Sequence, residues 1–365
     1  MRLSGWAVLL AGLMTAFSTA SCGGRASSEQ QVAEPTSARI GFSMDSFVVE
    51  RWQRDRDAFL TTAGEFGAQV LLRTANENVE VQRRQLIELD QSGVDVLVVV
   101  PNDSEELSDT IEQIHDRGNP ILAYDRMVRN TLVDGYISFD NQAIGTMMAR
   151  AVVEAGLSRL DETGEKAVLQ ILIINGAVSD YNSYMINRGI VTFLRPQIES
   201  GQVELLDNVW LQAWRNEEAR EAIAEAFDEF DNIDGVIAAN DLIADAVVYE
   251  AAARGQAGRL LVSGMDGDLA AVQRVAEGTQ LMTVYKPVED LARRAVESAI
   301  SLAQGDSLDT DETIFNGSGE IPFIRLEPVL VTRENIMETV IADGFHSYQD
   351  VYRNVPEEQR PIVQY

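Results

Sequence analysis

Residues 94–100 read VDVLVVV and are nearly all branched aliphatic. Such a run is typical of a parallel β-strand that is covered on both of its faces. On either side of it we expect further strands at 39–43, 68–73 and 120–124, and helices at 50–66, 79–92 and 104–117. A glycine follows each of these helices, at positions 67, 93 and 118, where a left-handed residue can end a helix. Strands that alternate with helices in this way predict a doubly wound parallel sheet.

A second series of the same kind occupies the middle of the chain. We expect strands at 167–174, 203–210, 235–239, 260–263 and 280–285, and helices at 182–194, 217–230, 242–254 and 269–277. Residues 321–332 read as one more strand, whereas residues 347–365 are polar, rich in tyrosine and assigned to no element. Two α/β units predict two lobes, and ligands of open α/β sheets bind at the carboxyl ends of the strands.

The first 22 residues have the pattern of an export signal. Arg2 precedes an apolar run at 6–20, which is short for a transmembrane helix but suits a signal peptide. Small residues then lead into Cys22, the only cysteine of the chain. This pattern predicts a bacterial lipoprotein signal over residues 1–22, with Cys22 lipidated and the protein anchored to a membrane. The alternative is an ordinary secretory signal cut near Ala20. Residues 23–37 are small and polar and read as a flexible tether.

Composition excludes several classes of function. The formal net charge of −29 argues against nucleic-acid binding, which needs a basic surface. His115 and His346 are the only histidines, so the sequence offers few residues from which a histidine-based catalytic triad or a histidine-rich zinc site could be built. No phosphate-binding loop, nucleophile elbow or metal-ligand cluster is evident. We therefore expect no catalytic residue, no cofactor and no metal.

Unusual polar side chains follow several of the predicted strands. They are Arg51 and Trp52 after the first strand, and then Asp125, Arg126, Asn240, Asp266 and Lys286 after later ones. A buried sugar needs this mixture, because carboxylates accept hydroxyls, amides accept and donate, cations donate, and an indole covers an apolar ring face. Each residue alone has a simpler explanation, as a helix cap, a turn former or a core residue. Together they favour a sugar-binding cleft between the two lobes.

Several longer motifs carry a family resemblance. They include ERWQ at 50–53, GVDVLV at 93–98, LAYDRM at 122–127, SGMDGDLA at 263–270 and GTQLMTVYKP at 278–287. In this order, from about residue 38 to 345, the sequence resembles the D-xylose-binding periplasmic proteins of ABC transporters. The resemblance implies an α/β fold of two doubly wound parallel-sheet lobes joined by a three-strand hinge, the type I periplasmic binding protein fold. It implies an N-terminal lobe of residues 38–140 plus 286–325, a C-terminal lobe of 141–285 plus 326–346, and a tail at 347–365.

The resemblance also carries over a binding pocket, position by position. Its residues are Arg51, Trp52, Asp125, Arg126, Asn182, Trp214, Asn240, Asp266 and Lys286, of which Asn182 and Trp214 rest on the resemblance alone. Tyr181 and the pair Gln212-Ala213 depart from the family pattern. The implied function is that of a monomeric extracytoplasmic protein that closes on D-xylose, or a close aldopentose, and docks on an ABC permease in the inner membrane.

Three other functions remain as alternatives. A sugar-processing enzyme would use Asp125 and Asp266 as an acid/base pair. A sugar-responsive transcription factor would need a basic DNA-binding segment before residue 38, where an export signal stands instead. A sensing lipoprotein would bind the same sugar and report it to a chemoreceptor or a sensor kinase.

Overall fold

The computed structural model describes residues 38–163 and 168–362. The predicted signal peptide, Cys22 and the predicted tether lie outside these residues. None of the helices within the described ranges is long and apolar enough to cross a membrane.

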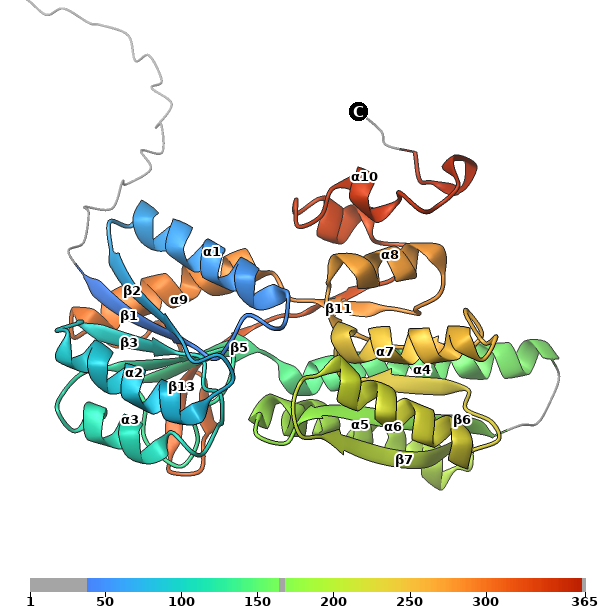
Figure 1. The fold of residues 1–365 in the computed structure, drawn as a ribbon, viewed down its shortest axis with the longest axis horizontal. Coiled ribbons are helices and arrows are strands. Elements are labelled where there is room, and N and C mark those ends of the chain that lie inside the picture. Colours follow the sequence, from blue (N-terminus) through green and yellow to red (C-terminus); the bar gives the residue numbers. More distant parts are fainter. Residues whose placement is uncertain (1–37, 164–167, 363–365) are drawn as a thin grey trace, which may run out of the picture. The chain divides into compact units, whose positions relative to one another are not determined.

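A large sheet organises the first part of the chain (Figure 1). Its seven strands among the described residues follow the order β12, β13, β5, β4, β3, β1, β2. They are β1 (Arg39–Met44), β2 (Gln69–Thr74), β3 (Val96–Val99), β4 (Ile121–Tyr124), β5 (Gly135–Phe139), β12 (Thr313–Phe315) and β13 (Glu320–Leu326). Only β12 pairs antiparallel, so the predicted parallel sheet is confirmed. Helices cover both of its faces: α1 (Arg51–Glu65), α2 (Val79–Gln91), α3 (Ser108–His115) and α9 (Val288–Ala303). We call this sheet with its helices the N-terminal lobe.

The helix ends of this lobe follow the local sequence. Gly67, Gly93 and Gly118 have φ angles of 73°, 69° and 89°, so the predicted left-handed residues after the helices are confirmed. At the opposite end of α2, the Asn78 carboxamide oxygen accepts a bond from the Val81 amide at 3.0 Å. The termini of these helices are thus determined by residues that stand next to them in the chain.

A parallel four-stranded sheet forms the centre of the second unit, the C-terminal lobe. Its order is β7, β6, β8, β9, with β6 (Leu169–Ala177), β7 (Val203–Leu211), β8 (Gly235–Ala238) and β9 (Leu261–Val262). Helices α4 (Asn141–Thr163) and α5 (Tyr181–Glu199) pack together, as do α6 (Asn216–Glu229) and α7 (Asp241–Ala253). The α4–α5 approach needs glycine, since a Cβ at Gly145 would lie 2.0 Å from the Ile186 carbonyl oxygen.

A third, small sheet confirms one predicted strand and corrects another. It contains β10 (Met265–Asp266), β11 (Thr283–Tyr285) and β14 (Val329–Val331), and α8 (Leu269–Glu277) lies between β10 and β11 in the chain. The predicted strand at 280–285 is confirmed as β11, with its observed start at Thr283. The single strand predicted at 321–332 is wrong, because β13 ends at Leu326 and β14 begins at Val329. Pro328 lies in the gap, and proline has no N–H to donate to a ladder.

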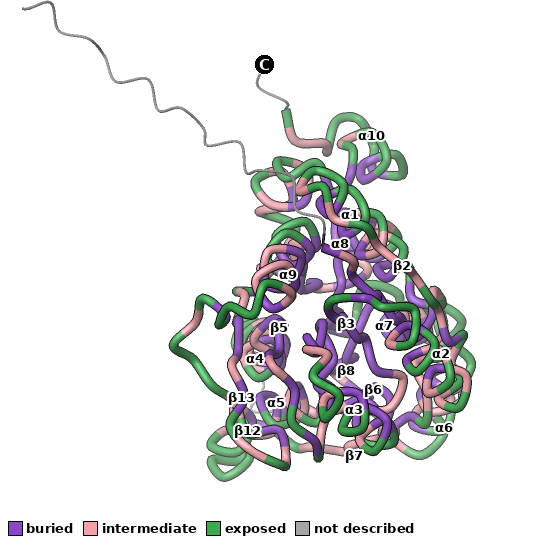
Figure 2. The backbone as a smooth tube through the Cα atoms, turned by 90° about the vertical axis from the view of Figure 1, so that its left-hand side faces the viewer, coloured by how far each residue is buried: buried purple, intermediate pink, exposed green. Residues whose placement is uncertain are grey.

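Three segments connect the two lobes. Within the described residues the chain crosses from one lobe to the other between β5 and α4, between β11 and α9, and between β13 and β14. Two of these places, after Phe139 and after Tyr285, join a strand to a helix, and the third joins two strands of different sheets. Figure 2 shows that buried residues concentrate in the central strands, while exposed residues follow the outer sides of the helices.

The tail, which the sequence left unassigned, packs on the C-terminal lobe. It includes α10 (Tyr348–Val351) and a 3-10 turn (Glu357–Gln359), and a π-helical turn (Met337–Ile341) precedes it. Val351, Tyr352 and Val355 are buried in a cluster with Val272 and Val275 of α8. Apolar residues spaced along a polar segment thus bind the tail to α8, and through α8 to the loop at Asp266.

Candidate functional site

The nine residues predicted for the pocket all line one cavity between the lobes. They are Arg51, Trp52, Asp125, Arg126, Asn182, Trp214, Asn240, Asp266 and Lys286, and Val49, Asp180 and Met265 complete the wall. The cavity is small, about 30 Å³. Both lobes therefore meet closely around the predicted site.

The elements explain why these residues converge. Asp125 and Arg126 follow β4, and Asn240 follows β8 as the first residue before α7. Arg51 opens α1, and Asn182 lies in the first turn of α5. Since the carboxyl ends of parallel strands and the starts of the following helices share one sheet edge, each lobe presents its polar side chains at one edge.

Asp125 is the centre of the contacts on the N-terminal side. Arg51 Nη2 donates to its carboxylate at 2.6 Å, and Asn182 Nδ2 of the other lobe lies at 3.2 Å. Burial opposes ionisation of Asp125, but Arg51 and Lys286 outweigh it and lower its pKa to about 2. The backbone has a φ of 58°, and Tyr136 and Ser138 hold it by donating to its carbonyl oxygen at 2.9 and 2.7 Å. This carboxylate is therefore charged, fixed and unsuited to act as a general acid.

Asp55 orients Arg51 from inside the N-terminal lobe. Its carboxylate lies 3.0 Å from Arg51 Nε and accepts a 2.6 Å bond from the Tyr124 hydroxyl. Burial raises the pKa of Asp55 to about 6, although Arg51 opposes this shift. The sequence analysis did not assign Asp55 a role. Its position four residues after Arg51, on the same face of a helix, was the available signal.

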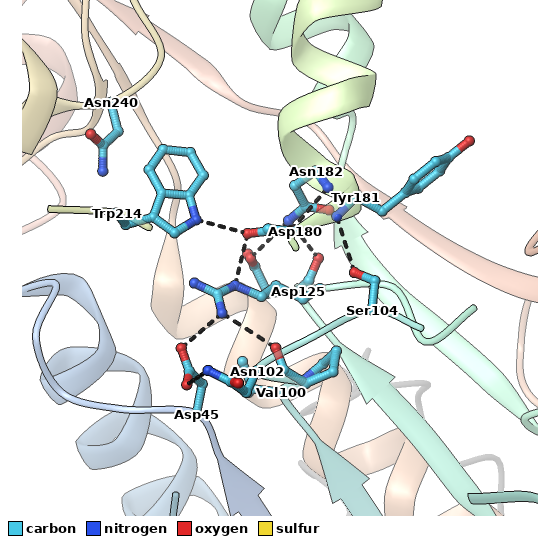
Figure 3. Close-up of polar contacts among 12 residues, drawn as sticks. Asp45, Val100, Asn102, Ser104, Asp125, Asp180, Tyr181, Asn182, Trp214 and Asn240 are labelled. Atoms are coloured by element: carbon cyan, nitrogen blue, oxygen red, sulfur yellow. Dashed lines mark hydrogen bonds and ion pairs between the residues drawn. The ribbon is translucent and has the colours of Figure 1, made fainter. Parts of the chain in front are cut away.

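Asp180 connects the lobes through Arg126 and also holds Trp214 of its own lobe. Its carboxylate lies 2.8 Å from Arg126 Nε and accepts a 3.1 Å bond from Trp214 Nε1 (Figure 3). Arg126 also donates to Asp45 at 2.8 Å. Asp45 and Asp180 were missed as members of the site. Asp45 follows the first strand, and Asp180 immediately precedes the α5 helix that carries Asn182. Both positions lie at the ligand-binding edge of a sheet, and this could have indicated that both residues belong to the site.

The two tryptophans have different surroundings. Trp52 is only 4% exposed, and the guanidinium carbons of Arg51 and Arg126 lie 4.8 and 5.3 Å from its ring centre. Trp214 lies over Gly176, where a Cβ would come within 2.0 Å of the indole. Gly176 is thus required for the position of the Trp214 ring.

Asp266 is the least constrained carboxylate of the cavity. Among the described residues its nearest polar side chains are Asn240 at 3.5 Å, Lys286 at 3.8 Å and Arg51 at 3.9 Å. Its φ of 104° is costly for a residue with a Cβ, and such strain often marks a functional position. The carboxylate therefore keeps unused capacity to accept hydrogen bonds.

A second buried carboxylate, Asp241, lies behind Asp266. It accepts bonds from Gln280 Nε2 at 3.0 Å and Thr283 Oγ1 at 2.8 Å. Burial raises its pKa to about 7, and the charge of Asp266 adds to the effect of burial. Asp241 therefore takes up a proton near neutral pH while it supports the segment that carries Asp266.

This arrangement suits a small polyhydroxylated ring. Carboxylates and cations from both lobes face the cavity, amides stand beside them, and an indole is present on each side. The fold and the site together define a two-lobed α/β binding protein.

Comparison with known proteins identifies the class more closely. The model of the periplasmic binding protein domain matches residues 40–307, and the chain belongs to this family. The chain is 33% identical to the D-xylose-binding periplasmic protein of Haemophilus influenzae, over 96% of this chain and 100% of that protein. Identity to the D-xylose-binding periplasmic protein of Escherichia coli is 36%, over 87% of this chain and 94% of that protein. A carbohydrate transporter solute binding protein of Chloroflexus aurantiacus, solved in complex with D-glucose, has a TM-score of 0.80 at 25% identity, covering 86% of this chain and 98% of that one.

Proposed function

We propose that this protein binds D-xylose, or a close aldopentose, between its two lobes as the exported binding component of an ABC importer. The observation that carries the proposal is the convergence of all nine predicted residues, from both lobes, on one cavity. The D-xylose-binding relatives from Haemophilus influenzae and Escherichia coli support the identity of the sugar. The protein binds and releases its ligand and does not transform it, in keeping with a family of binding proteins.

Binding requires motion of the lobes. Eight of the nine predicted pocket residues are at most 4% exposed, so a sugar cannot reach them from solvent while the lobes are in this arrangement. The lobes therefore separate about the three connecting strands to admit the sugar and close on it afterwards. Because the sugar touches both lobes only when they are closed, its contacts stabilise the closed state. Charge-assisted bonds to a desolvated sugar make a binding free energy of roughly −8 to −9 kcal/mol reasonable, or a micromolar Kd.

The cellular context belongs to the same proposal. The protein acts as a monomer outside the cytoplasm, is anchored through lipidated Cys22, and delivers its sugar to a permease in the inner membrane. The small residues before the single cysteine support the anchor. Metabolic labelling with a radioactive fatty acid tests it: the wild type should be labelled, and a Cys22→Ser variant should not.

Calorimetric titration with a panel of pentoses and hexoses tests the ligand. D-xylose should bind with a Kd in the micromolar range or below, and epimers should bind more weakly because a misplaced hydroxyl leaves buried polar groups unpaired. Failure of every pentose to bind below about 1 mM would refute the proposal. Wild-type affinity in both Trp214→Ala and Asp266→Ala would show that the sugar binds elsewhere.

A further inference from the structure

His346 connects the strained loop at Asp266 to the opposite lobe. It stands immediately before the tail and is 5% exposed. Its Nε2 atom lies 2.7 Å from the Gly267 carbonyl oxygen, and its Nδ1 atom lies 3.4 Å from Nη2 of Arg54 in α1. One imidazole therefore contacts the C-terminal lobe through one nitrogen and the N-terminal lobe through the other.

The chemistry of the two partners determines the tautomer of the ring. A carbonyl oxygen can only accept, so Nε2 must carry the hydrogen. A guanidinium can only donate, so Nδ1 must present its lone pair to Arg54. Only the neutral ring with hydrogen on Nε2 satisfies both contacts at once.

The contact with Gly267 supports a residue of the cavity. Asp266 and Gly267 both have positive φ angles, 104° and 69°. The Asp266 carboxylate has no partner closer than 3.5 Å among the described residues. The position of this carboxylate therefore depends on its backbone, and the bond from His346 holds the next peptide unit in place.

The contact with Arg54 joins the lobes. Arg54 Nη1 donates to the Phe345 carbonyl oxygen at 3.0 Å, and its guanidinium carbon lies 4.3 Å from the Phe345 ring centre. The Phe345 ring in turn packs against Tyr285, the residue before Lys286, with ring centres 4.7 Å apart. Arg54, Phe345 and His346 thus form a clasp between the lobes, one helical turn from Arg51 and next to a connecting strand.

We propose that His346 is a positioning residue for sugar binding, which holds the Asp266 loop in its binding geometry and secures the closed lobes through Arg54. This inference rests on the proposed sugar-binding function and names a residue outside the predicted pocket. Opening of the lobes breaks the contact with Arg54, so loss of the clasp speeds dissociation of the sugar more than it slows association.

Charged groups around the ring predict a pH dependence. Burial lowers the pKa of His346, Arg54 lowers it further, and Glu50 and Asp350 act in the opposite direction. Protonation places a second N–H against the Arg54 guanidinium and breaks that contact. Sugar affinity should therefore fall as the pH falls below the ordinary range of histidine.

Two substitutions separate positioning from simple structural support. His346→Gln retains a donor for Gly267 and an acceptor for Arg54, whereas His346→Ala removes both. His115→Ala is the matched control, because His115 is the only other histidine and lies on α3 outside the cavity wall. Stopped-flow tryptophan fluorescence and calorimetry with D-xylose give the rates and the Kd.

The alanine variant should raise Kd about 5- to 30-fold, mainly through a faster dissociation rate. The glutamine variant should stay within about threefold of the wild type and show a smaller decline of affinity at acidic pH. The control should match the wild type throughout. Wild-type Kd and dissociation rate in His346→Ala, or an equal loss in both His346 variants, would overturn the inference.

A measurement without sugar distinguishes this inference from the proposed function. Absence of xylose binding by the wild type would remove the proposed ligand. Nitrogen-15 NMR of the His346 imidazole still tests whether the clasp exists. Hydrogen on Nε2, together with an Nδ1 signal that shifts in Arg54→Met, supports the clasp. Hydrogen on Nδ1, or no response to Arg54→Met, refutes it. The NMR experiment also decides the matter where His346→Ala does not fold.

Discussion

The two sides of the cavity differ in how firmly their polar groups are held. On the N-terminal side, Asp125 lies 2.6 Å from Arg51, and Arg126 lies 2.8 Å from Asp45. On the C-terminal side, Asp266 has no polar partner nearer than 3.5 Å among the described residues. The N-terminal side is therefore preorganised by its own ion pairs, and the C-terminal side keeps hydrogen-bonding capacity for a ligand at Asp266. Preorganised side chains lose less conformational entropy when the ligand binds, and a carboxylate with free acceptor positions can form new hydrogen bonds to the ligand.

The largest expected effect is on stability and concerns the N-terminal side. Asp125→Asn leaves Arg51 and Lys286 buried beside one fewer negative charge, so we expect a loss of about 3–5 kcal/mol in the free energy of unfolding. Urea denaturation of the sugar-free protein measures it. Asp266→Asn is the matched control and should cost less than about 1 kcal/mol, because its ion contacts are long. Equal losses in the two variants would break the contrast between the sides.

The next effect is on affinity and concerns the C-terminal side. Asp266→Asn replaces a charged acceptor by an amide, so it should weaken D-xylose binding by about 1.5–3 kcal/mol, the value of a hydrogen bond to a charged group. Calorimetry at constant pH gives the Kd, and Asp228→Asn, on α6 with a side chain that is 75% exposed, serves as a control. An unchanged Kd would mean that Asp266 does not contact the sugar.

Titration should also distinguish the two sides. Asp241 has its pKa raised to about 7, so the folded state binds more protons than the unfolded state between about pH 4 and 7. Stability should therefore fall as the pH rises from 6 to 7, by at most about 1.4 kcal/mol for one group. Asp125, with a pKa of about 2, loses its contribution only as the pH falls below about 4.

Thermal unfolding at several pH values, compared with that of Asp241→Asn, tests this difference. Asp55, with a pKa of about 6, acts in the same direction mainly below pH 6. Burial and the charge of Asp241 also raise the pKa of Asp268, so the window from pH 6 to 7 reports on Asp241 together with its neighbour Asp268. The slope in this window should be smaller in the variant. An identical slope in the two proteins would contradict the assignment.

The smallest expected effect concerns the indole on the C-terminal side. Trp214→Phe keeps an aromatic face but loses the bond from Nε1 to Asp180. Binding should weaken by about 0.5–1.5 kcal/mol, the net value of a typical hydrogen bond. Trp214→Ala should cost more, because the face is lost as well. Equal Kd values for the phenylalanine variant and the wild type would show that the bond to Asp180 does not position the ring for binding.

Much of the fold followed from the sequence, for reasons visible at particular residues. The aliphatic run around residue 97 could only be a buried strand or helix, and its length and flanking segments favoured a strand. Asp125 and Asn240 could be placed near the ligand edge because each directly follows a strand. Asp55 could not be recognised in the same way, because it lies inside a helix and its partner Tyr124 lies on β4 and meets it only after packing.

By itself, the sequence determined the alternation of strands and helices, the two lobes and most of the side chains around the cavity. Those features depend on local patterns, on strand ends that share an edge, and on motifs shared with relatives. Only the tertiary structure decided that β11 and β14 form a separate small sheet, that the tail packs on α8, and that His346 contacts both Gly267 and Arg54. Each of these depends on which distant segments come into contact. Burial and charge pairing between such segments produce no periodic pattern in the sequence from which the contact could be predicted.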